Sequence, residues 1–545
     1  MSTVYSAFTR TAARRGDAEF LCVEAVTAAS YDIDAGPRSW REVAGEVERL
    51  RASYAQAGYG HGHRVGLLLE NRPAFFTHWL ALNALGVSIV PIHADMQPAE
   101  WQYLIRHSEI SLAVAQPGKE AGLRAAAAEI GADLQTIRPE VAGRIPAARV
   151  PARFERRPVD RDSECALLYT SGTTGKPKGC RLANGYFLRA GEWYLGLQDM
   201  AEVVPDIDRF ITPLPLSHMN ALAFSSMAAI LSGGCLVQLD RFHPATWWQS
   251  VRASRATIAH YLGVMPAMLL GAPPSANDRD HKLRFGFGAG VDSRHHAAFE
   301  ERFGLPLLEA WAMTETGAAA CIMAHREPRH VGTNCFGRAE AFVETRVVDE
   351  KGVDVAVDAP GELLVRAAGA DPRQDFFLDY LKDEAATEEA WADGWFHTGD
   401  VVQRSAAGDF HFVDRRKNVI RRSGENISAL EVESILNLHP AVAASAVAAT
   451  PDPVRGDEVL ACIVLRKTSG HAPAQDAIAV SIVRHALERL TYFKVPGYVA
   501  FVESLPLTVS QKIQRGELRE MARTLPSKPN CVDTREMKRR RKLKQ

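Results

Sequence analysis

Two short apolar stretches separated by one helical segment constrain the fold of this chain most strongly. RVGLLLEN (64–71) is predicted to be a short buried strand, and VSIVPIH (87–93) is a second strand that is rich in β-branched residues. Pro73 suits the first turn of a helix between these strands, and Gly86 can end that helix. Two strands and one helix within about thirty residues form a βαβ unit, which predicts a parallel sheet.

The alternation of helices and strands continues along the N-terminal part of the chain. A helix is expected around residues 222–232, followed by the strand CLVQL (235–239) and later by LRFGFGAG (283–290). After residue 335 the pattern changes to alternating strands separated by turn residues, which predicts a small antiparallel section. The fold class is therefore predicted to be α/β, with a large N-terminal domain of parallel-sheet layers.

A second unit, a smaller C-terminal α+β domain, is predicted to follow Asp414. Ser428 and Glu431 have the spacing of a capping box at the start of a helix. VAASAVAA (442–449) and EVLACIVLR (458–466) are predicted to be strands. The predicted boundaries are residues 1–416 for the large domain, 417–525 for the small domain and 526–545 for a basic tail.

The basic tail ends in TREMKRRRKLKQ (534–545). A role in binding nucleic acid or anionic lipid is one interpretation of this charge. We expect the other interpretation, in which the tail is solvated and disordered.

Length, charge and cysteine content exclude several classes of protein. A chain of 545 residues is too long for one compact core. Its formal net charge of −1 creates no global field that would attract nucleic acid or a membrane. Eight cysteines without a CxxC pair fit reduced thiols and argue against a disulfide framework or a zinc site. The first residues lack an apolar core of signal-peptide length, and no stretch is apolar over the length of a bilayer. We expect a cytoplasmic protein, monomeric or homo-oligomeric, with no nucleic-acid partner and no stable membrane insertion.

The sequence TSGTTGKPKG (170–179) has the composition of a loop that binds phosphate. Its glycines let the backbone approach an anion, and successive N–H groups can form an anion nest. The loop lacks the GxxxxGK[ST] spacing of a Walker A motif. A surface loop that binds nothing is the alternative. The predicted ligand-binding residues are Thr170, Ser171, Gly172, Thr173, Thr174, Gly175 and Lys176.

Seven motifs follow one another in a fixed order. They are YTSGTTGKPKG (169–179), PLPLSH (213–218), FGFGAG (285–290), EAWAMTETG (309–317), GWFHTGD (394–400), DRRKNVIRRSGENISALEVE (414–433) and LPLTVSQKIQRGELR (505–519). In this order the motifs resemble those of the adenylate-forming superfamily of acyl-CoA synthetases, standalone adenylation domains and luciferases. Within that superfamily, the chain looks most like carnitine/crotonobetaine-type and other small-acid CoA ligases.

The resemblance implies an ATP-dependent carboxylic acid–CoA ligase that works in two steps. A small carboxylic acid attacks the α-phosphate of ATP to give acyl-AMP and pyrophosphate, and the thiol of coenzyme A then displaces AMP. ATP, Mg²⁺ and coenzyme A are the implied cofactors, and the small domain is expected to rotate between the steps. Transfer of the acyl group to a carrier protein or another nucleophile is the alternative. A nucleotide-binding regulatory protein without the chemistry is a third interpretation.

The resemblance also assigns roles around the phosphates. The 170–176 loop would grip the β- and γ-phosphates, and Thr314 would hydrogen-bond to the α-phosphate. Glu315 would hold Mg²⁺, and a surface carboxylate is the alternative for this residue. Arg326 and Arg329 are interpreted as surface arginines, or as partners of a second carboxylate on the substrate.

Adenine and ribose are assigned to a second group of residues. Trp311, which stands where tyrosine is usual, would offer an aromatic face to adenine. Asp400 would accept hydrogen bonds from the ribose hydroxyls, or would simply be a turn residue. Arg415 would reach the ribose or the phosphate. Adenine would lie against the strand-to-helix turn formed by Gly288, Ala289 and Gly290.

The remaining assignments concern catalysis and domain rotation. Lys512 would stabilise the negative charge that develops between the carboxylate and the α-phosphate, with an ordinary exposed lysine as the alternative. His218 would border the acyl pocket, or would be a buried core histidine. Lys417 would be the hinge between the domains, or one more charge in a basic run. Ser423 and Gly424 would begin the loop that lines the thiol tunnel.

Overall fold

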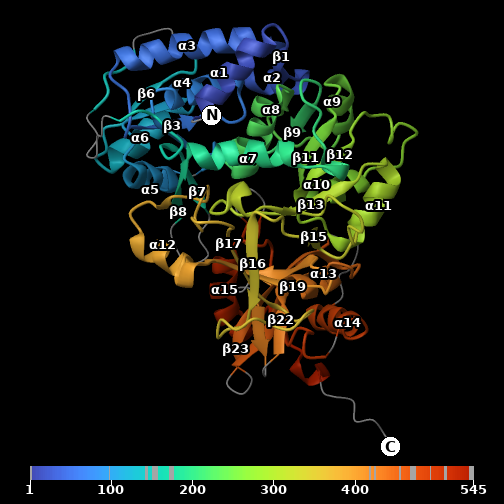
Figure 1. Ribbon diagram of the computed structural model, residues 1–545. Coiled ribbons are helices and arrows are strands. Elements are labelled where there is room, and N and C mark those ends of the chain that lie inside the picture. The colour runs from blue at the N-terminus through green and yellow to red at the C-terminus, as the bar shows by residue number, and fades with distance from the viewer. Residues whose placement is uncertain are drawn as a thin grey trace, which may run out of the picture.

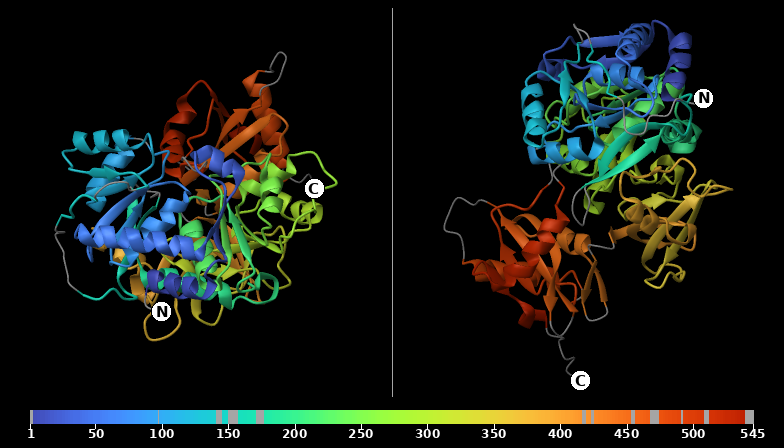
Figure 2. Two further views of the ribbon diagram at one scale, coloured as in Figure 1. Left: turned by 90° about the horizontal axis from the view of Figure 1, so that it is seen from above. Right: turned by 90° about the vertical axis from the view of Figure 1, so that its left-hand side faces the viewer.

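The computed structural model describes residues 3–96, 98–140, 145–149, 157–170, 177–415, 419–422, 425–452, 456–466, 474–490, 492–507 and 512–538. Its elements form one large body with two smaller lobes beneath it (Figure 1; Figure 2, right). One lobe is an antiparallel sheet that continues the large domain, and the other is the small C-terminal domain. The α/β fold class with a small second domain is therefore confirmed.

The large body contains two mainly parallel sheets. The first has the strand order β14-β13-β12-β11-β9-β10-β1-β2, and the second has the order β18-β8-β7-β4-β3-β5-β6. The first consists of β1 (Glu19–Val23), β2 (Gly36–Ser39), β9 (Arg209–Thr212), β10 (Cys235–Gln238), β11 (Ile258–Leu262), β12 (Phe285–Ala289), β13 (Leu307–Trp311) and β14 (Ile322–Met323). The second consists of β3 (Arg64–Leu68), β4 (Ser88–Pro91), β5 (Leu112–Ala115), β6 (Gln135–Ile137), β7 (Glu164–Thr170), β8 (Lys178–Ala183) and β18 (Asp379–Tyr380).

Helices fill the space between the two sheets and cover their outer faces. The helices of the large domain are α1 (Val4–Arg15), α2 (Ala25–Tyr31), α3 (Trp40–Gln56), α4 (Pro73–Asn83), α5 (Pro98–Ser108), α6 (Glu120–Glu129), α7 (Asn184–Gly196), α8 (Ser226–Ser232), α9 (Trp247–Ala253), α10 (Val264–Leu270), α11 (Ser293–Phe303) and α12 (Glu384–Ala390). The central helices α1, α4, α7 and α8 contact one another and share one apolar core with both sheets. Helices α5 and α6 form a separate apolar layer on the second sheet.

The βαβ unit predicted from the sequence is confirmed. Helix α4 begins at Pro73, as expected, and lies between β3 and β4 in the chain. The two strands pair in parallel, with Val65 opposite Ile89. The predicted strands were longer than the observed ones, because the polar residues at their C-terminal ends already belong to the following turns.

The two smaller lobes are mainly antiparallel sheets. The first has the order β15-β20-β19-β17-β16, and the C-terminal domain has β22-β21-β24-β25-β26 with β23 paired to β24. The first consists of β15 (Cys335–Gly337), β16 (Val343–Val348), β17 (Gly361–Ala367), β19 (Phe396–Arg404) and β20 (Phe410–Arg415). The C-terminal domain consists of β21 (Val419–Arg422), β22 (Glu425–Ser428), α13 (Ala429–Leu436), β23 (Val442–Asp452), β24 (Gly456–Leu465), α14 (Gln475–Leu487), β25 (Tyr498–Phe501), α15 (Arg515–Thr524) and β26 (Cys531–Asp533).

The prediction of a disordered tail from residue 526 is wrong for residues 526–538. Strand β26 pairs with β25, and a 3-10 turn follows it (Arg535–Lys538). Val532 and Met537 pack against the core of the small domain. The apolar side chains of these two residues therefore keep the segment packed on the domain. Its high content of charged residues, taken alone, predicts an exposed tail. The remainder, residues 539–545, lies outside the described part of the chain.

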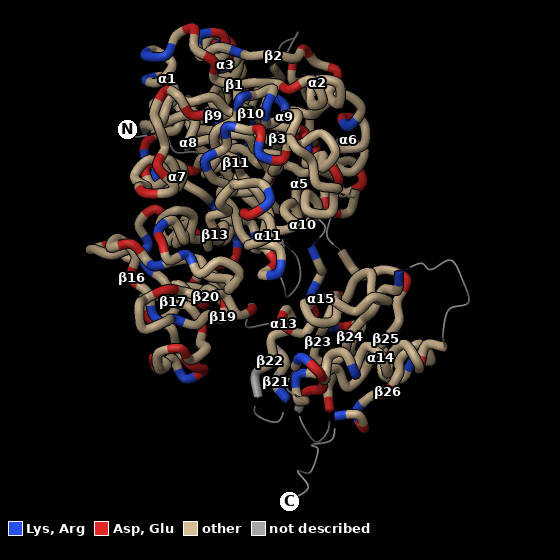
Figure 3. Tube along the Cα trace, turned by 90° about the vertical axis from the view of Figure 1, so that its right-hand side faces the viewer, with Lys and Arg blue, Asp and Glu red and all other residues tan. Residues whose placement is uncertain are grey.

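Other features agree with the composition. All eight cysteines are free thiols. Basic and acidic residues are interspersed over both domains (Figure 3), which fits the near-zero net charge. Over the ranges that the structure describes, no helix combines the length and apolar character needed to cross a membrane.

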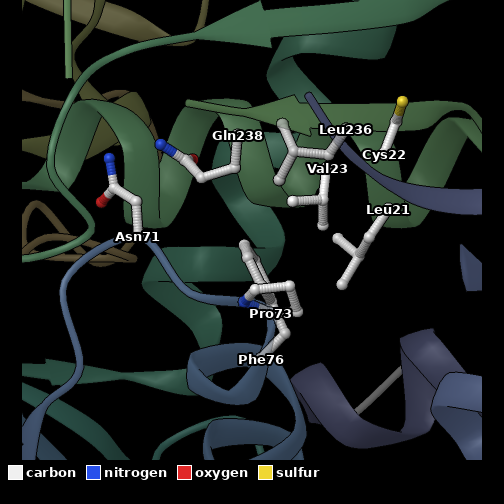
Figure 4. Close-up of a pocket in the computed structure, with 8 residues that line it drawn as sticks. All are labelled: Leu21, Cys22, Val23, Asn71, Pro73, Phe76, Leu236 and Gln238. Carbon is white, nitrogen blue, oxygen red and sulfur yellow. The ribbon is translucent and has the colours of Figure 1, made fainter. Parts of the chain in front are cut away.

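A small cavity lies beside the start of α4 (Figure 4). It has room for about one water molecule. The amide nitrogen of Gln238 donates to three backbone carbonyls, whereas its buried Oε1 has no hydrogen-bond partner among the residues described. The cavity is too small for an organic acid and is not a candidate for the active site. It is lined by Leu21, Cys22, Val23, Asn71, Pro73, Phe76, Leu236 and Gln238.

A charge network crosses the second sheet at the start of β7. Arg64 donates two hydrogen bonds to Glu164, at 2.7 and 2.9 Å, and Arg181 donates to the same carboxylate at 2.8 Å. Arg181 also bonds to Asp379 at 2.8 Å. Burial opposes ionisation of Glu164, but the hydrogen bonds and charges of the two arginines outweigh it and lower the pKa of Glu164 to about 2.

We predict that Glu164→Gln destabilises the protein most above pH 5. The folded pKa of about 2 lies below the unfolded value, so the ionised carboxylate contributes fully above about pH 4.5 and its contribution is lost as the pH falls toward 2. The expected loss at pH 7 is on the order of 3 kcal/mol. Urea unfolding of both proteins between pH 7 and pH 3 measures the difference, which should shrink at the acid end.

Asp17→Asn, which removes an exposed partner of Arg41, is the control and should leave the urea midpoint unchanged. A pH-independent difference for Glu164→Gln would contradict the assignment.

Candidate active site

The two ends of the predicted phosphate loop are fixed by an antiparallel strand pair. Thr170 ends β7 and lies opposite Lys178, the first residue of β8. The hydroxyl of Thr170 donates to the carbonyl of Lys178 at 3.4 Å. Strands β7 and β8 therefore form a hairpin whose paired ends lie on either side of residues 171–176. Six predicted ligands, Ser171, Gly172, Thr173, Thr174, Gly175 and Lys176, lie outside the described residues.

Helix α5 anchors both sides of this hairpin. The hydroxyl of Tyr103 donates to the carbonyl of Pro177 at 2.8 Å, and Nδ1 of His107 lies 2.9 Å from the hydroxyl of Tyr169. Burial and the charges of Lys382 and Arg64 lower the pKa of His107. This anchor could not be predicted from the local sequence, because the helix precedes the loop by more than sixty residues.

Glu315 is held by a residue that the motifs did not identify. The hydroxyl of Tyr380, in β18, donates to Oε1 of Glu315 at 2.8 Å. Lys178 places its ammonium group 4.5 Å from the centre of the same tyrosine ring, as a cation–π contact. Strand β18 pairs with β8, so sheet pairing brings Glu315 beside the phosphate-loop hairpin. Thr314 precedes it in the turn that follows β13.

A buried carboxylate supports the turn at residues 288–290. Glu309, in β13, accepts hydrogen bonds from the hydroxyl of Tyr261 at 2.7 Å and from the backbone N–H groups of Gly290 and Val291 at 2.9 and 3.2 Å. Burial raises the pKa of Glu309, although these donors oppose the shift. Gly290 has a positive φ of 78°, and a Cβ on Gly288 would lie 2.4 Å from the carbonyl oxygen of Tyr261. Glycine is therefore favoured at 290 by the positive φ and at 288 by the lack of space for a Cβ. Ala289 and Gly290 are exposed, so the turn is open to a ligand.

Trp311 and Asp400 are in direct contact. Nε1 of Trp311 donates to Oδ2 of Asp400 at 2.9 Å, and both side chains are buried. The hydroxyl of Thr398 accepts from the backbone N–H of Asp400 at 3.0 Å. Arg415 lies opposite Asp400 in the β19–β20 ladder. Trp311, predicted for adenine, and Asp400, predicted for ribose, are thus in contact, and the indole N–H orients the carboxylate.

His218 and Lys512 come from different domains and lie near each other. His218 is reached by solvent but is surrounded by protein on most sides. Burial, the nearby charge of Lys512 and His93 together lower the pKa of His218 to about 4. The imidazole is therefore neutral at pH 7. The charge of Lys512 in the small domain therefore acts on the histidine that was predicted to border the acyl pocket.

The segment after His218 begins a π-helix (Asn220–Ser225) that covers a buried histidine. His260 contacts Asn220 Oδ1 at 3.0 Å and Ser225 Oγ at 2.8 Å through Nδ1, and the hydroxyl of Tyr194 at 3.1 Å through Nε2. Burial lowers the pKa of His260 to about 3. The sequence pattern did not single out this cluster. A π-helical insertion of this kind is often found at functional sites.

Aromatic rings fill the space next to this cluster. The rings of Trp193, Phe224 and Phe287 lie 5.3 to 6.0 Å apart, and His260 lies 4.8 Å from Phe287. All four side chains are buried. This packing closes the core beneath the π-helix.

Helix α13 is bound at both ends. At its N-terminus, Asp414 accepts hydrogen bonds from the hydroxyl of Ser428 at 3.0 Å and from the N–H of Leu430 at 3.4 Å. Nearer its C-terminus, Glu433 accepts two hydrogen bonds from Arg515 at 2.6 and 2.7 Å. Ser428 also caps the helix, as predicted. Arg515 lies three residues after Lys512 and therefore links the lysine segment to the helix.

Several predicted residues are not brought into the site or lie outside the description. Arg326 pairs with Asp199 and Glu340, and buried Arg329 pairs with Glu300 and Glu327, so carboxylates of the protein already neutralise both. The interpretation of these two arginines as partners of a second substrate carboxylate is therefore not supported. Lys417, Ser423, Gly424 and the side chain of Arg415 lie outside the described part of the chain.

The described residues thus bring several of the predicted site residues together at contacts between distant parts of the chain. Residues 8–370 match the family described as AMP-binding enzyme, and residues 431–512 match the AMP-binding enzyme C-terminal domain. The chain belongs to this family, and the predicted adenylate-forming class is confirmed.

Relatives and solved structures agree with this assignment. The crotonobetaine/carnitine–CoA ligase of Shigella flexneri is 30% identical over 496 residues, covering 88% of this chain and 93% of that protein. The sulfoacetate–CoA ligase of Cupriavidus necator is 31% identical over 488 residues, covering 87% and 91%. ATP-bound MatB from Rhodopseudomonas palustris has a TM-score of 0.78 and 25% identity, covering 96% of this chain and 99% of that chain.

We predict that Trp311→Phe weakens ATP binding. Phenylalanine keeps an aromatic face but removes the Nε1–H that orients Asp400. Loss of one buried hydrogen bond to a charged group should raise the dissociation constant of ATP by about tenfold. Calorimetric titration with ATP measures the change. Trp395→Phe is the matched control, because Trp395 stacks with Arg366 in the antiparallel lobe. Equal ATP affinity in Trp311→Phe and the wild type would contradict the role.

Proposed function

We propose that this protein is an ATP-dependent carboxylic acid–CoA ligase that acts on a small acid. In the first step, a carboxylate oxygen attacks the α-phosphorus of ATP, the bond to the β-phosphate oxygen breaks, and acyl-AMP and pyrophosphate form. In the second step, the sulfur of coenzyme A attacks the acyl carbon, the bond to the AMP oxygen breaks, and the thiol loses its proton. The observation that carries the proposal is that both parts of the chain match the AMP-binding enzyme family, and the charge of Lys512 in the small domain is near enough to lower the pKa of His218.

The residues near the nucleotide support the first step. Lys512 would stabilise the negative charge that develops as the carboxylate and the α-phosphate approach, because a positioned cation is most effective where water is partly excluded. Thr314 would donate to the α-phosphate. Asp400, oriented by Trp311, would accept from the ribose hydroxyls. The turn that Glu309 supports would lie against adenine.

Glu315 fits the role of Mg²⁺ ligand. Mg²⁺ is commonly bound by one or two carboxylates together with substrate phosphates, and Glu315 lies beside the phosphate-loop hairpin with its carboxylate fixed by Tyr380. Within the described ranges, no group of three or more His, Cys, Asp or Glu side chains could hold a metal by itself. The ion would offset phosphate charge.

The size of the acid is inferred from the packing beneath the π-helix. Trp193, Phe224 and Phe287 pack against one another beneath the π-helix that follows His218, and we expect this packing to limit the depth of an acyl pocket there. Ala312, in place of the more usual glycine, adds a methyl group after Trp311. The names of the relatives, crotonobetaine/carnitine–CoA ligase and sulfoacetate–CoA ligase, also refer to small acids.

The direct test is AMP formation across a panel of carboxylic acids, each with and without coenzyme A. We expect turnover with short acids and a strong dependence on coenzyme A. Turnover that is confined to long-chain fatty acids would contradict the proposal that the enzyme acts on a small acid. Acyl-AMP formation without any thioester would instead favour transfer to a carrier protein or another nucleophile.

We predict that Lys512→Ala separates the two half-reactions. The variant should lose acyl-AMP formation by about a hundredfold or more, because a charge that stabilises the transition state contributes on the order of 3 kcal/mol. It should keep most of the transfer from preformed acyl-AMP to coenzyme A. Pyrophosphate exchange and thioester formation measure the two steps. Lys494→Ala, which removes a lysine paired with Glu431 in the same domain, is the control. Equal losses in both steps would refute the role of Lys512.

A further inference from the structure

A π-helix lies between His218 and the regular helix α8, and hydrogen bonds fix both of its ends. The N–H and the hydroxyl of Ser226 both donate to the carbonyl of Ala221, five residues earlier, which is the bonding pattern of a π-helix. At the other end, the N–H of Leu222 donates to the carbonyl of His218 at 3.0 Å. The backbone of His218 is therefore joined directly to this wider turn.

His260, in β11, contacts the first and the last residue of the π-helix through one ring nitrogen. Its Nδ1 lies 3.0 Å from Oδ1 of Asn220 and 2.8 Å from Oγ of Ser225. The amide oxygen can only accept, so Nδ1 carries the proton and donates to it. Nε2 then accepts from the hydroxyl of Tyr194 at 3.1 Å. Burial lowers the pKa of His260 to about 3, so the ring is neutral at pH 7 and keeps this tautomer.

The two contacts of Nδ1 need the wider helix. In an α-helix each residue turns by about 100°, so residues five apart lie about 140° apart around the axis. Two side chains at that angle would point too far apart to meet at one atom. The i→i+5 pattern of a π-helix brings Asn220 and Ser225 to the same side, where His260 contacts both. The buried histidine therefore favours the π-helix over an α-helical alternative.

The type of helix at residues 220–225 affects the direction of His218. A π-turn holds one residue more than an α-turn. The residues before it are therefore rotated by about 100° relative to α8, compared with a continuous α-helix. We propose that His260 is a positioning residue for the acyl side of the active site, acting through Asn220 and Ser225 on the orientation of His218. This inference rests on the proposed function, in which His218 borders the acyl pocket.

The next residue of β11 supports the other side of the site. The hydroxyl of Tyr261 donates to Glu309, which also accepts from the N–H groups of Gly290 and Val291 at the turn proposed for adenine. Successive side chains of a strand point to opposite faces of the sheet. Removing the contacts of His260 should therefore affect the acid and leave the nucleotide unaffected.

The test compares two substitutions of His260 in the full chain. His260→Phe keeps a ring but has no donor for the π-helix, whereas His260→Asn keeps an N–H donor near the position of Nδ1. In a pyrophosphate-exchange assay, His260→Phe should raise the KM for the acid by about tenfold, the effect of one buried hydrogen bond. The KM for the acid in His260→Asn should stay within about threefold of the wild type. The dissociation constant of ATP, measured by calorimetric titration, should change by less than about twofold in both.

Two further variants separate positioning from general destabilisation. Ser225→Ala removes one partner of Nδ1 with little change in volume, and it decides the question if His260→Phe does not fold. We expect Ser225→Ala to raise the KM for the acid by about threefold. Tyr194→Phe is the matched control, because it removes a buried hydrogen bond from the same ring at the nitrogen that does not contact the π-helix. It should leave the KM for the acid unchanged.

Three results would overturn the role of His260 and leave the proposed function standing. They are an unchanged KM for the acid in His260→Phe and Ser225→Ala, an equal rise in the KM for the acid and the dissociation constant of ATP, and an effect of Tyr194→Phe as large as that of His260→Phe. A wild-type protein that forms acyl-AMP with no acid of the panel would overturn both proposals.

Discussion

The buried ion pair between Glu433 and Arg515 determines where the small domain can present Lys512. Both side chains are largely inaccessible to solvent, and the two hydrogen bonds between them have the fork geometry of an arginine–carboxylate pair. Separating such a pair would leave an uncompensated charge in the interior, which is strongly unfavourable. The segment that carries the lysine therefore moves with α13 and not independently of it.

The other end of α13 is linked to the large domain. Asp414 belongs to β20, the strand that pairs with the strand containing Asp400, and it accepts from Ser428 and Leu430 at the start of the helix. A short chain of contacts thus leads from the proposed ribose carboxylate to the proposed catalytic lysine. The predicted hinge position lies between Asp414 and the helix. Rotation there would change the capping contact of Asp414 but would carry the Glu433–Arg515 pair along intact.

Local sequence patterns predicted the parts of the fold that depend on neighbouring residues. The unit of β3, α4 and β4 follows from apolar runs and from Pro73, which act within one short stretch. The motifs also led to the prediction of nucleotide-binding residues. They could not show that Tyr380 holds Glu315, because that contact joins residues 65 positions apart and depends on the order of strands in a sheet.

The contact of Trp311 with Asp400 spans 89 positions and was missed for the same reason. Glu309 lies within one of the motifs, but nothing in the local sequence shows that its carboxylate faces the turn at residues 288–290. The end of the chain was misassigned by composition. Its many charged residues predict that it is exposed to solvent. Lys538 instead pairs with Glu458, which lies 80 residues earlier in the chain and is itself buried.

Carboxylates that are buried or half-buried fix local structure in both domains, through neutral donors at Glu309 and through arginine partners at Glu164, Glu433 and Glu458. In the large domain, Glu309 is satisfied by a hydroxyl and two backbone N–H groups, so it shapes a turn that stays in place beneath a ligand. In the small domain, Glu433 and Glu458 are paired with Arg515 and Arg422. Ion pairs of this kind resist local rearrangement because any partial opening exposes two unpaired charges. Under the proposed function, the small domain would turn one face to acyl-AMP formation and another to thiol attack, and these ion pairs would let it rotate as one rigid unit.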